Sequence, residues 1–373
     1  MKDSQKFLGR LALQQRVLPR YRTAFVDCLA QACAGGLYIF AGESLPVEGI
    51  ERAANLQVAL LTQAQNLCFR DPSSGLFLCW QRGFVHWLEE VQPEALIVEA
   101  NPRNLATRWA VRWMHRHGRP VVGWGLGAPP LEGTLTALRR WERSSLLHSL
   151  DAVVAYSRRG AEQYRLLGLP AERVFVASNA VAPPPSQPPA EKEITPGVTL
   201  TVLFVGRLQE RKRLDLLLKA CAALPLELQP RLLIAGDGPD RERLQAMAEE
   251  VYPAAEFLGA KHGSDLESYF DAAHLFVLPG TGGLAVQQAM SHALPVIVAR
   301  GDGTQDDLVR PHNGWQIPPD DLDSLKEVLE LALSDPLRLR QMGREGYRIV
   351  VEEVNVEAMV QVFLEALFTV RHC

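Results

Sequence analysis

The stretch Val202–Asp215, VLFVGRLQERKRLD, carries the strongest structural signal in the chain. Its apolar run ends at Gly206, and helical periodicity starts near Leu214, as in a strand–loop–helix unit of a parallel sheet. The glycine lets the backbone approach a ligand closely. Arg207 and Lys212 lie beside the helix start, where free N–H groups favour anions, so the stretch predicts a diphosphate site. A helix-start loop with surface cations is the alternative interpretation.

Apolar runs alternate with helical periodicity on both sides of this stretch, which favours an α/β fold with parallel sheets. We predict strands at Leu11–Val17, Leu37–Ala41, Ala95–Glu99, Pro120–Trp124, Ala152–Ala155, Val174–Ala177, Thr199–Val205, Arg231–Ala235, Glu256–Leu258, Leu275–Leu278 and Pro295–Ala299. We predict helices at Arg20–Cys33, Trp80–Val91, Leu105–His117, Glu132–His148, Leu214–Ala223, Arg241–Val251, Leu284–His292 and Leu322–Leu333, with a last, broken helix at Leu337–Phe368.

A proline-rich stretch from Ala182 to Gly197 interrupts this alternation. Proline fixes φ and removes a hydrogen-bond donor, so the stretch predicts a semi-rigid linker. We therefore expect an N-terminal domain at 1–182, a linker at 183–198 and a C-terminal domain at 199–373, with the last helix a candidate to cross back to the N-terminal domain. Two α/β domains of similar size make the cleft between them the natural ligand site.

Composition excludes several classes of protein. Of the 373 residues, 47% are hydrophobic and 22% charged, as in a globular protein and unlike a disordered chain. The longest stretch without a formal charge, Ala272–Ala299, is interrupted by proline and glycines, so we expect no spanning helix. The N-terminal residues lack the apolar core of a signal peptide. Six cysteines without a CxxC pair indicate free thiols in a reducing cytoplasm.

Charge is distributed unevenly along the chain. Residues 1–190 contain 21 Lys and Arg against 15 Asp and Glu, whereas residues 191–373 contain 18 against 28. A basic first half is typical of proteins that meet an acidic substrate or an anionic membrane surface, although solvated surface charge is an equal alternative. We expect a cytoplasmic protein, with peripheral attachment to the inner face of the membrane as a candidate, and no nucleic-acid partner.

Three further motifs follow Val202–Asp215 in order. They are Gly236-Asp237-Gly238-Pro239, Phe257-Leu258-Gly259 and the run LFVLPGTGGLAVQQAMSHALPVIVA at 275–299. Together the set resembles the C-terminal half of the family-4 glycosyltransferases, continuously from about Val202 to Leu333. The similarity is looser in the first half and strongest at Asp151–Val181. It implies the GT-B fold, in which two Rossmann-like parallel-sheet domains face an interdomain cleft, the first for the acceptor and the second for the donor.

The resemblance also implies an activity. Members of this family are retaining, metal-independent enzymes that use a nucleotide-diphosphate sugar and no further cofactor. We expect a hexosyltransferase-type enzyme that extends a glycan or lipid-linked acceptor in polysaccharide biosynthesis. The implied catalytic groups are Arg207 and Lys212, which would hold the diphosphate. The implied donor-binding positions are Gly206, Gly236, Gly259 and Ala260, the last two facing the nucleobase, and the loop Gly280, Thr281, Gly282, Gly283 and Leu284.

Two positions depart from the family's pattern. Its paired glutamates, eight residues apart, correspond to Gly280 and Gln288. The Gln288 amide can still bond ribose hydroxyls, but Gly280 offers only backbone. A second hypothesis is therefore a catalytically silent homologue that binds a nucleotide or a partner enzyme. A sugar-nucleotide epimerase on the same architecture is a third.

In the first half, polar residues that follow predicted strands are the candidates for acceptor contacts. Glu99 is also a candidate catalytic group, with a helix cap before Pro102 as the alternative. The further acceptor candidates are Asn101, Trp124, Arg20 and Arg22, and membrane contact is the alternative for the two arginines.

Two motifs compete with this interpretation. Gly280–Ala285 matches the dinucleotide fingerprint G-x-G-x-x-A, with Asp302 after the next strand. That fingerprint normally opens a domain, whereas this one follows several strand–helix units. Asp321-Leu322-Asp323 matches the D-x-D metal motif, but acids at a helix start favour a cap, so we predict no metal site.

Overall fold

The computed structural model describes residues 6–48, 50–53, 56–70, 72, 74, 76–133, 135–190, 198–261, 263–282, 284–301 and 303–371. The chain divides into two compact units, the first Met1–Pro183 with Val356–Cys373 and the second Pro184–Asn355. Of the predicted linker, residues 191–197 lie outside the described residues. In the described part of the chain, no helix is both long and apolar enough to cross a membrane.

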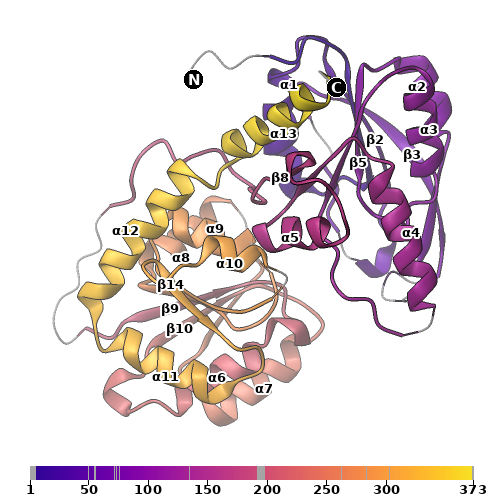
Figure 1. The fold of residues 1–373 in the computed structure, drawn as a ribbon. Helices are drawn as coiled ribbons and strands as arrows, with labels where there is room; N and C mark the ends of the chain where they lie inside the picture. The colour runs from indigo at the N-terminus through magenta and orange to yellow at the C-terminus, as the bar shows by residue number, and fades with distance from the viewer. Residues whose placement is uncertain are drawn as a thin grey trace. The chain divides into compact units, whose positions relative to one another are not determined.

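The first unit is built on an eight-stranded sheet with the strand order β4-β3-β2-β1-β5-β6-β7-β8 (Figure 1). All neighbouring strands are parallel except β3 and β4. The strands are β1 Leu11–Val17, β2 Leu37–Gly42, β3 Leu60–Phe69, β4 Leu78–Arg82, β5 Ala95–Glu99, β6 Val121–Gly125, β7 Ala152–Ala155 and β8 Val174–Val176. The helices are α1 Thr23–Gln31, α2 Phe84–Val91, α3 Thr107–Arg116, α4 Thr136–His148, α5 Arg158–Leu166 and α13 Val356–Arg371.

The two faces of this sheet bury separate cores because successive strand residues point to opposite sides. On one face, Leu13 and Ile97 pack with Phe25 of α1 and Phe363 of α13. On the other face, Ala12 and its neighbours pack with residues of α2, α3 and α5. Helix α13, from the C-terminal end of the chain, therefore completes the first unit beside α1 (Figure 1).

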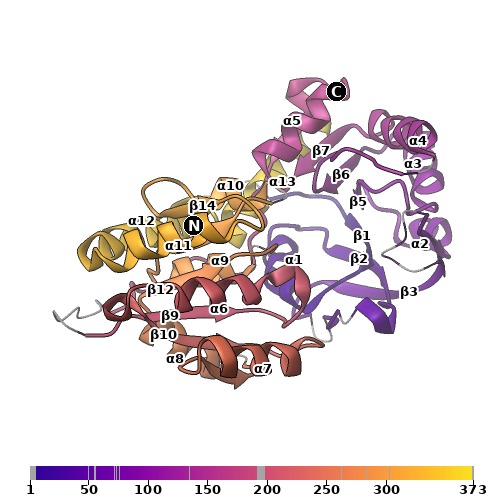
Figure 2. The ribbon, with the colours of Figure 1, turned by 90° about the horizontal axis from the view of Figure 1, so that it is seen from below.

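The second unit has a six-stranded, all-parallel sheet with the order β11-β10-β9-β12-β13-β14. The strands are β9 Thr201–Val205, β10 Arg231–Ala235, β11 Glu256–Gly259, β12 Leu275–Leu278, β13 Val296–Ala299 and β14 Gly314–Ile317. The helices are α6 Leu214–Ala222, α7 Arg241–Val251, α8 Ser264–Ala272, α9 Leu284–Ser291, α10 Thr304–Leu308, α11 Leu322–Leu333 and α12 Pro336–Glu352. Helices α6 and α7 run alongside β9 and β10 (Figure 2).

The predicted α/β fold is confirmed, and one predicted element needs correction. Trp80–Val91 is not one helix, because Trp80–Arg82 belongs to β4 and pairs antiparallel with β3. Gly83, at a φ of 82°, then allows the turn that starts α2. Strand β3 is not among the predicted strands, because its mostly exposed side chains give little apolar signal. The β3–β4 register brings the sulfur atoms of Cys68 and Cys79 to 3.2 Å.

Candidate functional site

Three glycines predicted to bind the sugar-nucleotide donor lie together at the carboxyl ends of neighbouring strands in the second unit. Gly206 donates its N–H to Ala235 at 3.0 Å, and Gly236 donates to Gly259 at 2.8 Å. A Cβ at Gly236 would lie 1.9 Å from the carbonyl oxygen of Gly206, so no larger residue fits there. Ala260, the next predicted position, is exposed directly after β11. This edge of the sheet thus presents backbone rather than side chains.

Lys212 is held beside this glycine edge. It ends the short 3₁₀ helix Glu210–Lys212 that follows β9. A Cβ at Gly206 would lie 3.7 Å from the lysine's Cδ and Cε, so the lysine stem passes over that glycine. Its Nζ donates to the carbonyl oxygen of Thr281 at 2.6 Å. Burial, and then the charge of Arg211, lower the pKa of Lys212 to about 8. The lysine is therefore positioned, but it carries no carboxylate counter-ion in this contact.

Arg207, the second predicted cation, is exposed. Its side chain makes no hydrogen bond to any residue that the structure describes. The two cations therefore differ in how they are held: Lys212 is fixed by a hydrogen bond to Thr281, whereas Arg207 extends into solvent.

The loop after β12 is fastened to the turn that carries Lys212. Thr281 donates its N–H to the carbonyl oxygen of Arg211 at 3.0 Å, and the Gln305 side chain donates to Gly282 at 2.9 Å. A Cβ at Gly280 would lie 2.3 Å from the Arg211 carbonyl oxygen, so this loop packs backbone against backbone. Gly283 lies outside the described residues.

Leu284 starts helix α9, and Gln288 is half-buried on the same helix. The Gln288 side chain makes no hydrogen bond within the described part of the chain. The structure thus brings the predicted donor positions Gly206, Lys212, Gly236, Gly259, Gly280, Thr281 and Gly282 to one end of the second sheet.

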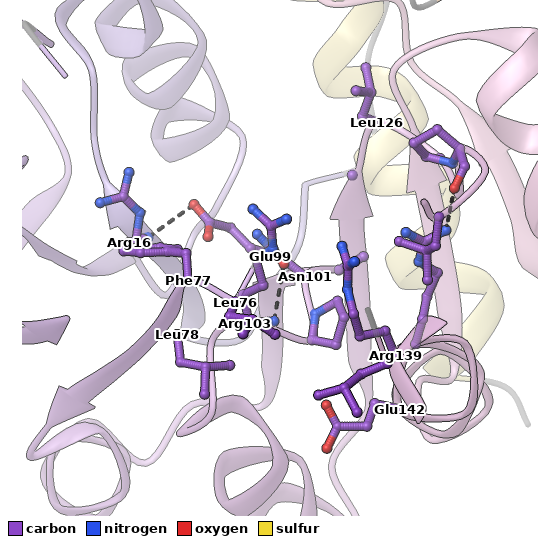
Figure 3. A pocket seen from close by; sticks show the side chains of 18 of the residues that line it. Arg16, Leu76, Phe77, Leu78, Glu99, Asn101, Arg103, Leu126, Arg139 and Glu142 are labelled. Atoms are coloured by element: carbon purple, nitrogen blue, oxygen red, sulfur yellow. Dashed lines mark hydrogen bonds between the residues drawn. The ribbon is translucent and has the colours of Figure 1, made fainter. Parts of the chain in front are cut away.

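The first unit contains a cavity of about 780 Å³ at the carboxyl ends of its strands (Figure 3). Glu99, Asn101 and Trp124, three of the predicted acceptor-side residues, line it. Arg20 does not; it is exposed and pairs with Glu51.

Glu99 is bonded at the end of β5 rather than at a helix start. It accepts a hydrogen bond from the Arg16 backbone N–H at 3.0 Å and another from the Asn104 side chain. Burial raises the pKa of Glu99, and these hydrogen bonds oppose that shift. Helix α3 starts only at Thr107, with Ala106 at its N-cap, so the carboxylate does not cap it. Asn101 instead accepts from the Arg103 N–H at 3.1 Å, which fixes the turn between β5 and α3.

Arg22 and Trp124, 102 positions apart, are in direct contact. The Arg22 guanidinium lies 3.9 Å from the centre of a Trp124 ring and donates to the Tyr156 hydroxyl at 3.1 Å. Both residues are buried, with exposed fractions of 5% and 1%. A cation on an aromatic face with a further hydrogen bond is a stabilising arrangement. Arg22 therefore supports the wall of the cavity from behind Trp124.

Three arginines that are not among the predicted site residues also line this cavity: Arg103, Arg139 and Arg143. They come from the β5–α3 connection and from α4, and no local motif joins them. The one sequence signal related to them is the net positive charge of residues 1–190.

The D-x-D motif has the predicted structural role. Asp321 is the N-cap of α11 and accepts from the Ser324 N–H at 3.0 Å and from its hydroxyl at 2.7 Å. The predicted helix cap is thus confirmed. Asp302, which completed the dinucleotide fingerprint, lies outside the described residues.

Residues 190–349, almost all of the second unit, match the family "Glycosyl transferases group 1". The chain is 34% identical over 194 residues to a GDP-mannose-dependent alpha-mannosyltransferase of Mycobacterium tuberculosis, covering 50% of this chain and 48% of that protein. It is 23% identical over 298 residues to the lipopolysaccharide core biosynthesis glycosyltransferase LpsE of Rhizobium meliloti, covering 75% and 87%. The chain thus spans about half of the first relative and most of the second.

Similarity to solved structures extends over both units. Anabaena Alr3699/HepE, solved in complex with UDP, superposes with a TM-score of 0.71 at 15% identity, covering 97% of this chain and 100% of that one. Sucrose-phosphate synthase from Thermosynechococcus elongatus gives a TM-score of 0.70 at 19% identity, covering 94% and 96%. The chain therefore has the GT-B fold, and residues 190–349 of its second unit match the group 1 glycosyl transferases.

Proposed function

We propose that the chain transfers a sugar from a nucleotide-diphosphate sugar to a glycan or lipid-linked acceptor, with retention of configuration and without metal or cofactor. The observation that carries this proposal is Lys212, whose Nζ is held at the glycine edge of the second sheet by a neutral carbonyl. A departing diphosphate is a stronger acceptor for that ammonium than the Thr281 carbonyl. Relatives named as GDP-mannose-dependent and a UDP complex of a structural neighbour support a nucleotide donor of either base.

The chemistry that we propose depends on positioning and charge. Lys212 and Arg207 would offset the charge that develops on the leaving diphosphate, the role that a divalent metal plays in other transferases. Asp321 of the D-x-D motif is already engaged as a helix cap, in agreement with a metal-independent reaction. Glu99 would orient an acceptor hydroxyl, because it lines the cavity of the first unit and burial raises the pKa of its carboxyl.

A second candidate function is a nucleotide- or partner-binding scaffold. It is favoured by the two positions where the family's glutamates are replaced, Gly280 and Gln288. Gly280 packs closely on Arg211, where a larger side chain would not fit, which supports a loop without that carboxylate. A nucleotide-binding scaffold and the enzyme would share the nucleotide site and differ only in turnover.

A panel of UDP, GDP, ADP and dTDP tests this proposal. We expect one of them to stabilise the chain by about 2.7 kcal/mol at 100 times its Kd. The matching nucleotide sugar should then be consumed only when an acceptor is added. Tight nucleotide binding without turnover would favour the scaffold, and an altered free sugar without acceptor would favour an epimerase. Failure of all four nucleotides to stabilise the chain would contradict the transferase, the epimerase and the nucleotide-binding form of the scaffold.

We also propose a cytoplasmic enzyme with peripheral attachment to an anionic membrane. Helix α4 exposes Leu138 and Trp141, the latter 64% exposed, on the basic first unit. We expect co-sedimentation with phosphatidylglycerol vesicles at low salt and its loss at high salt, since surface electrostatics decay over about 10 Å at 0.1 M ionic strength. Trp141→Ser should weaken binding, while Leu166→Ser, at an 80% exposed position of α5, is the matched control. Equal binding to neutral vesicles would refute the attachment.

A further inference from the structure

The cavity of the first unit carries a positive charge that the protein does not neutralise. Five arginines and two glutamates line it. Arg16 is already paired with Glu48, and Glu99 is committed to the Arg16 N–H and to Asn104. Arg70 is exposed and lies over the Phe69 ring. The other three arginines are Arg103, Arg139 and Arg143, which we term the arginine cluster.

The arginine cluster is held without a carboxylate. Arg139 donates to the carbonyl oxygen of Glu132 at 2.9 Å, and Arg143 donates to that of Pro129 at 2.6 Å. No member of the cluster forms an ion pair with any described residue, Glu142 of the same cavity included. Burial, and then the charge of Arg139, lower the pKa of Arg103, and burial with the charges of Arg139 and Arg103 lowers that of Arg143. The cluster is thus an arrangement of like charges that a bound anion would relieve.

The rest of the lining is largely apolar. The side chains of Leu76, Phe77 and Leu78 form one wall, and Leu126 lies toward the opposite end, with Arg139 reaching into the space from α4 (Figure 3). A volume of about 780 Å³ is large enough for a drug-sized organic molecule and far larger than a lone anion needs. The ligand that fits has a charged group and an apolar body.

We propose that the arginine cluster binds a phosphate group of the acceptor, while the apolar wall receives the chain attached to that phosphate. Guanidinium groups match phosphate oxygens in pairs, and three of them suit the charge and the three terminal oxygens of a phosphate monoester better than a single carboxylate. The identification of this ligand as the acceptor rests on the proposed transferase function. The binding of an alkyl phosphate in the cavity is independent of that function.

Calorimetric titration of the full chain with octyl phosphate, inorganic phosphate and octyl glucoside tests the proposal. Octyl phosphate should bind at least tenfold more tightly than either of the others. Inorganic phosphate lacks the alkyl chain, and octyl glucoside lacks the phosphate. The combined variant Arg103→Gln, Arg139→Gln, Arg143→Gln should weaken octyl phosphate binding at least 30-fold. Arg140→Gln, one residue along α4 on an exposed position outside the cavity lining, is the matched control and should change it less than twofold.

The outcomes distinguish the proposed alkyl phosphate site from its proposed use as the acceptor site. Unchanged octyl phosphate affinity in the combined variant would overturn the site, as would equal affinity for inorganic phosphate, which would indicate a simple anion site. If the combined variant fails to fold, the single pair Arg139→Gln and Arg140→Gln gives the same contrast. Nucleotide-induced stabilisation is measured on the same proteins. Its absence with octyl phosphate binding intact would reject the transferase function and leave the phosphate site standing.

Discussion

Replacement of Lys212 by alanine is expected to lower turnover about 100- to 1,000-fold, the usual cost of removing one donor to a developing negative charge. The fold already places Nζ at the glycine edge and holds it there through the Thr281 carbonyl at 2.6 Å. Little reorganisation is then needed when a diphosphate replaces that carbonyl. The effect should fall on kcat with the wild-type donor, measured by nucleotide release.

Lys219→Ala is the matched control, since Lys219 is exposed on α6 in the same unit. It should leave turnover within twofold. Both variants should melt at the wild-type temperature within about 2 °C, because neither removes a large apolar side chain. Turnover of Lys212→Ala within threefold of wild type would remove the lysine from the reaction.

The same lysine predicts a pH dependence with opposite signs for binding and for stability. Its pKa of about 8 lies below the ordinary 10.5, because burial and Arg211 disfavour the charged form. Nucleotide binding, which needs the ammonium, should therefore weaken as the pH rises through about 8. Between about 8 and 10.5 the unfolded chain holds the proton more tightly, so this group's contribution to stability rises with pH over that window. Lys212→Met should lose both trends in a thermal-shift titration.

Much of the fold follows from local pattern. Ala95–Glu99 and Leu275–Leu278 have their predicted bounds because short apolar runs end there at polar residues or proline. Trp80–Arg82 was assigned to a helix because its strand character depends on pairing with β3, which a local pattern does not contain. Tertiary pairing overrides propensity at such places.

The candidate site is predictable to a different degree in each unit. In the second unit, the glycines and Lys212 lie within loops that follow strands, so motif and strand-end position together identify them. In the first unit, Arg103 and the two α4 arginines are distant in sequence and belong to no motif. These arginines line one cavity only because the sheet and α4 pack against each other in the folded unit. Glu99 was identified from its strand end, but its partner Asn104 was not.

Gly280→Glu, which restores the glutamate that the family resemblance implies at this position, is expected to destabilise the second unit by about 1–3 kcal/mol, the usual cost of overpacking. The new Cβ would lie 2.3 Å from the Arg211 carbonyl oxygen and 2.5 Å from the Lys212 Cα. These are backbone atoms, which cannot rotate away, so the Glu210–Lys212 turn must shift. At about 2–4 °C per kcal/mol for a unit of this size, the melting temperature should fall measurably.

Gly280→Ala carries the same Cβ and should show most of this loss, which separates steric overlap from the added charge. Gln288→Glu, at the other departed position, is half-buried on α9 and should change stability by only about 0.5 kcal/mol. Any displacement of the turn also moves Lys212, so Gly280→Glu should lower donor binding as well as stability. A stable Gly280→Glu protein with increased turnover would mean that the loop does not pack on Arg211 in solution, and that a carboxylate is what the reaction lacks. Loss of stability in both Gly280 variants, with Gln288→Glu unaffected, would instead show that glycine is required at 280 by the backbone that positions the lysine.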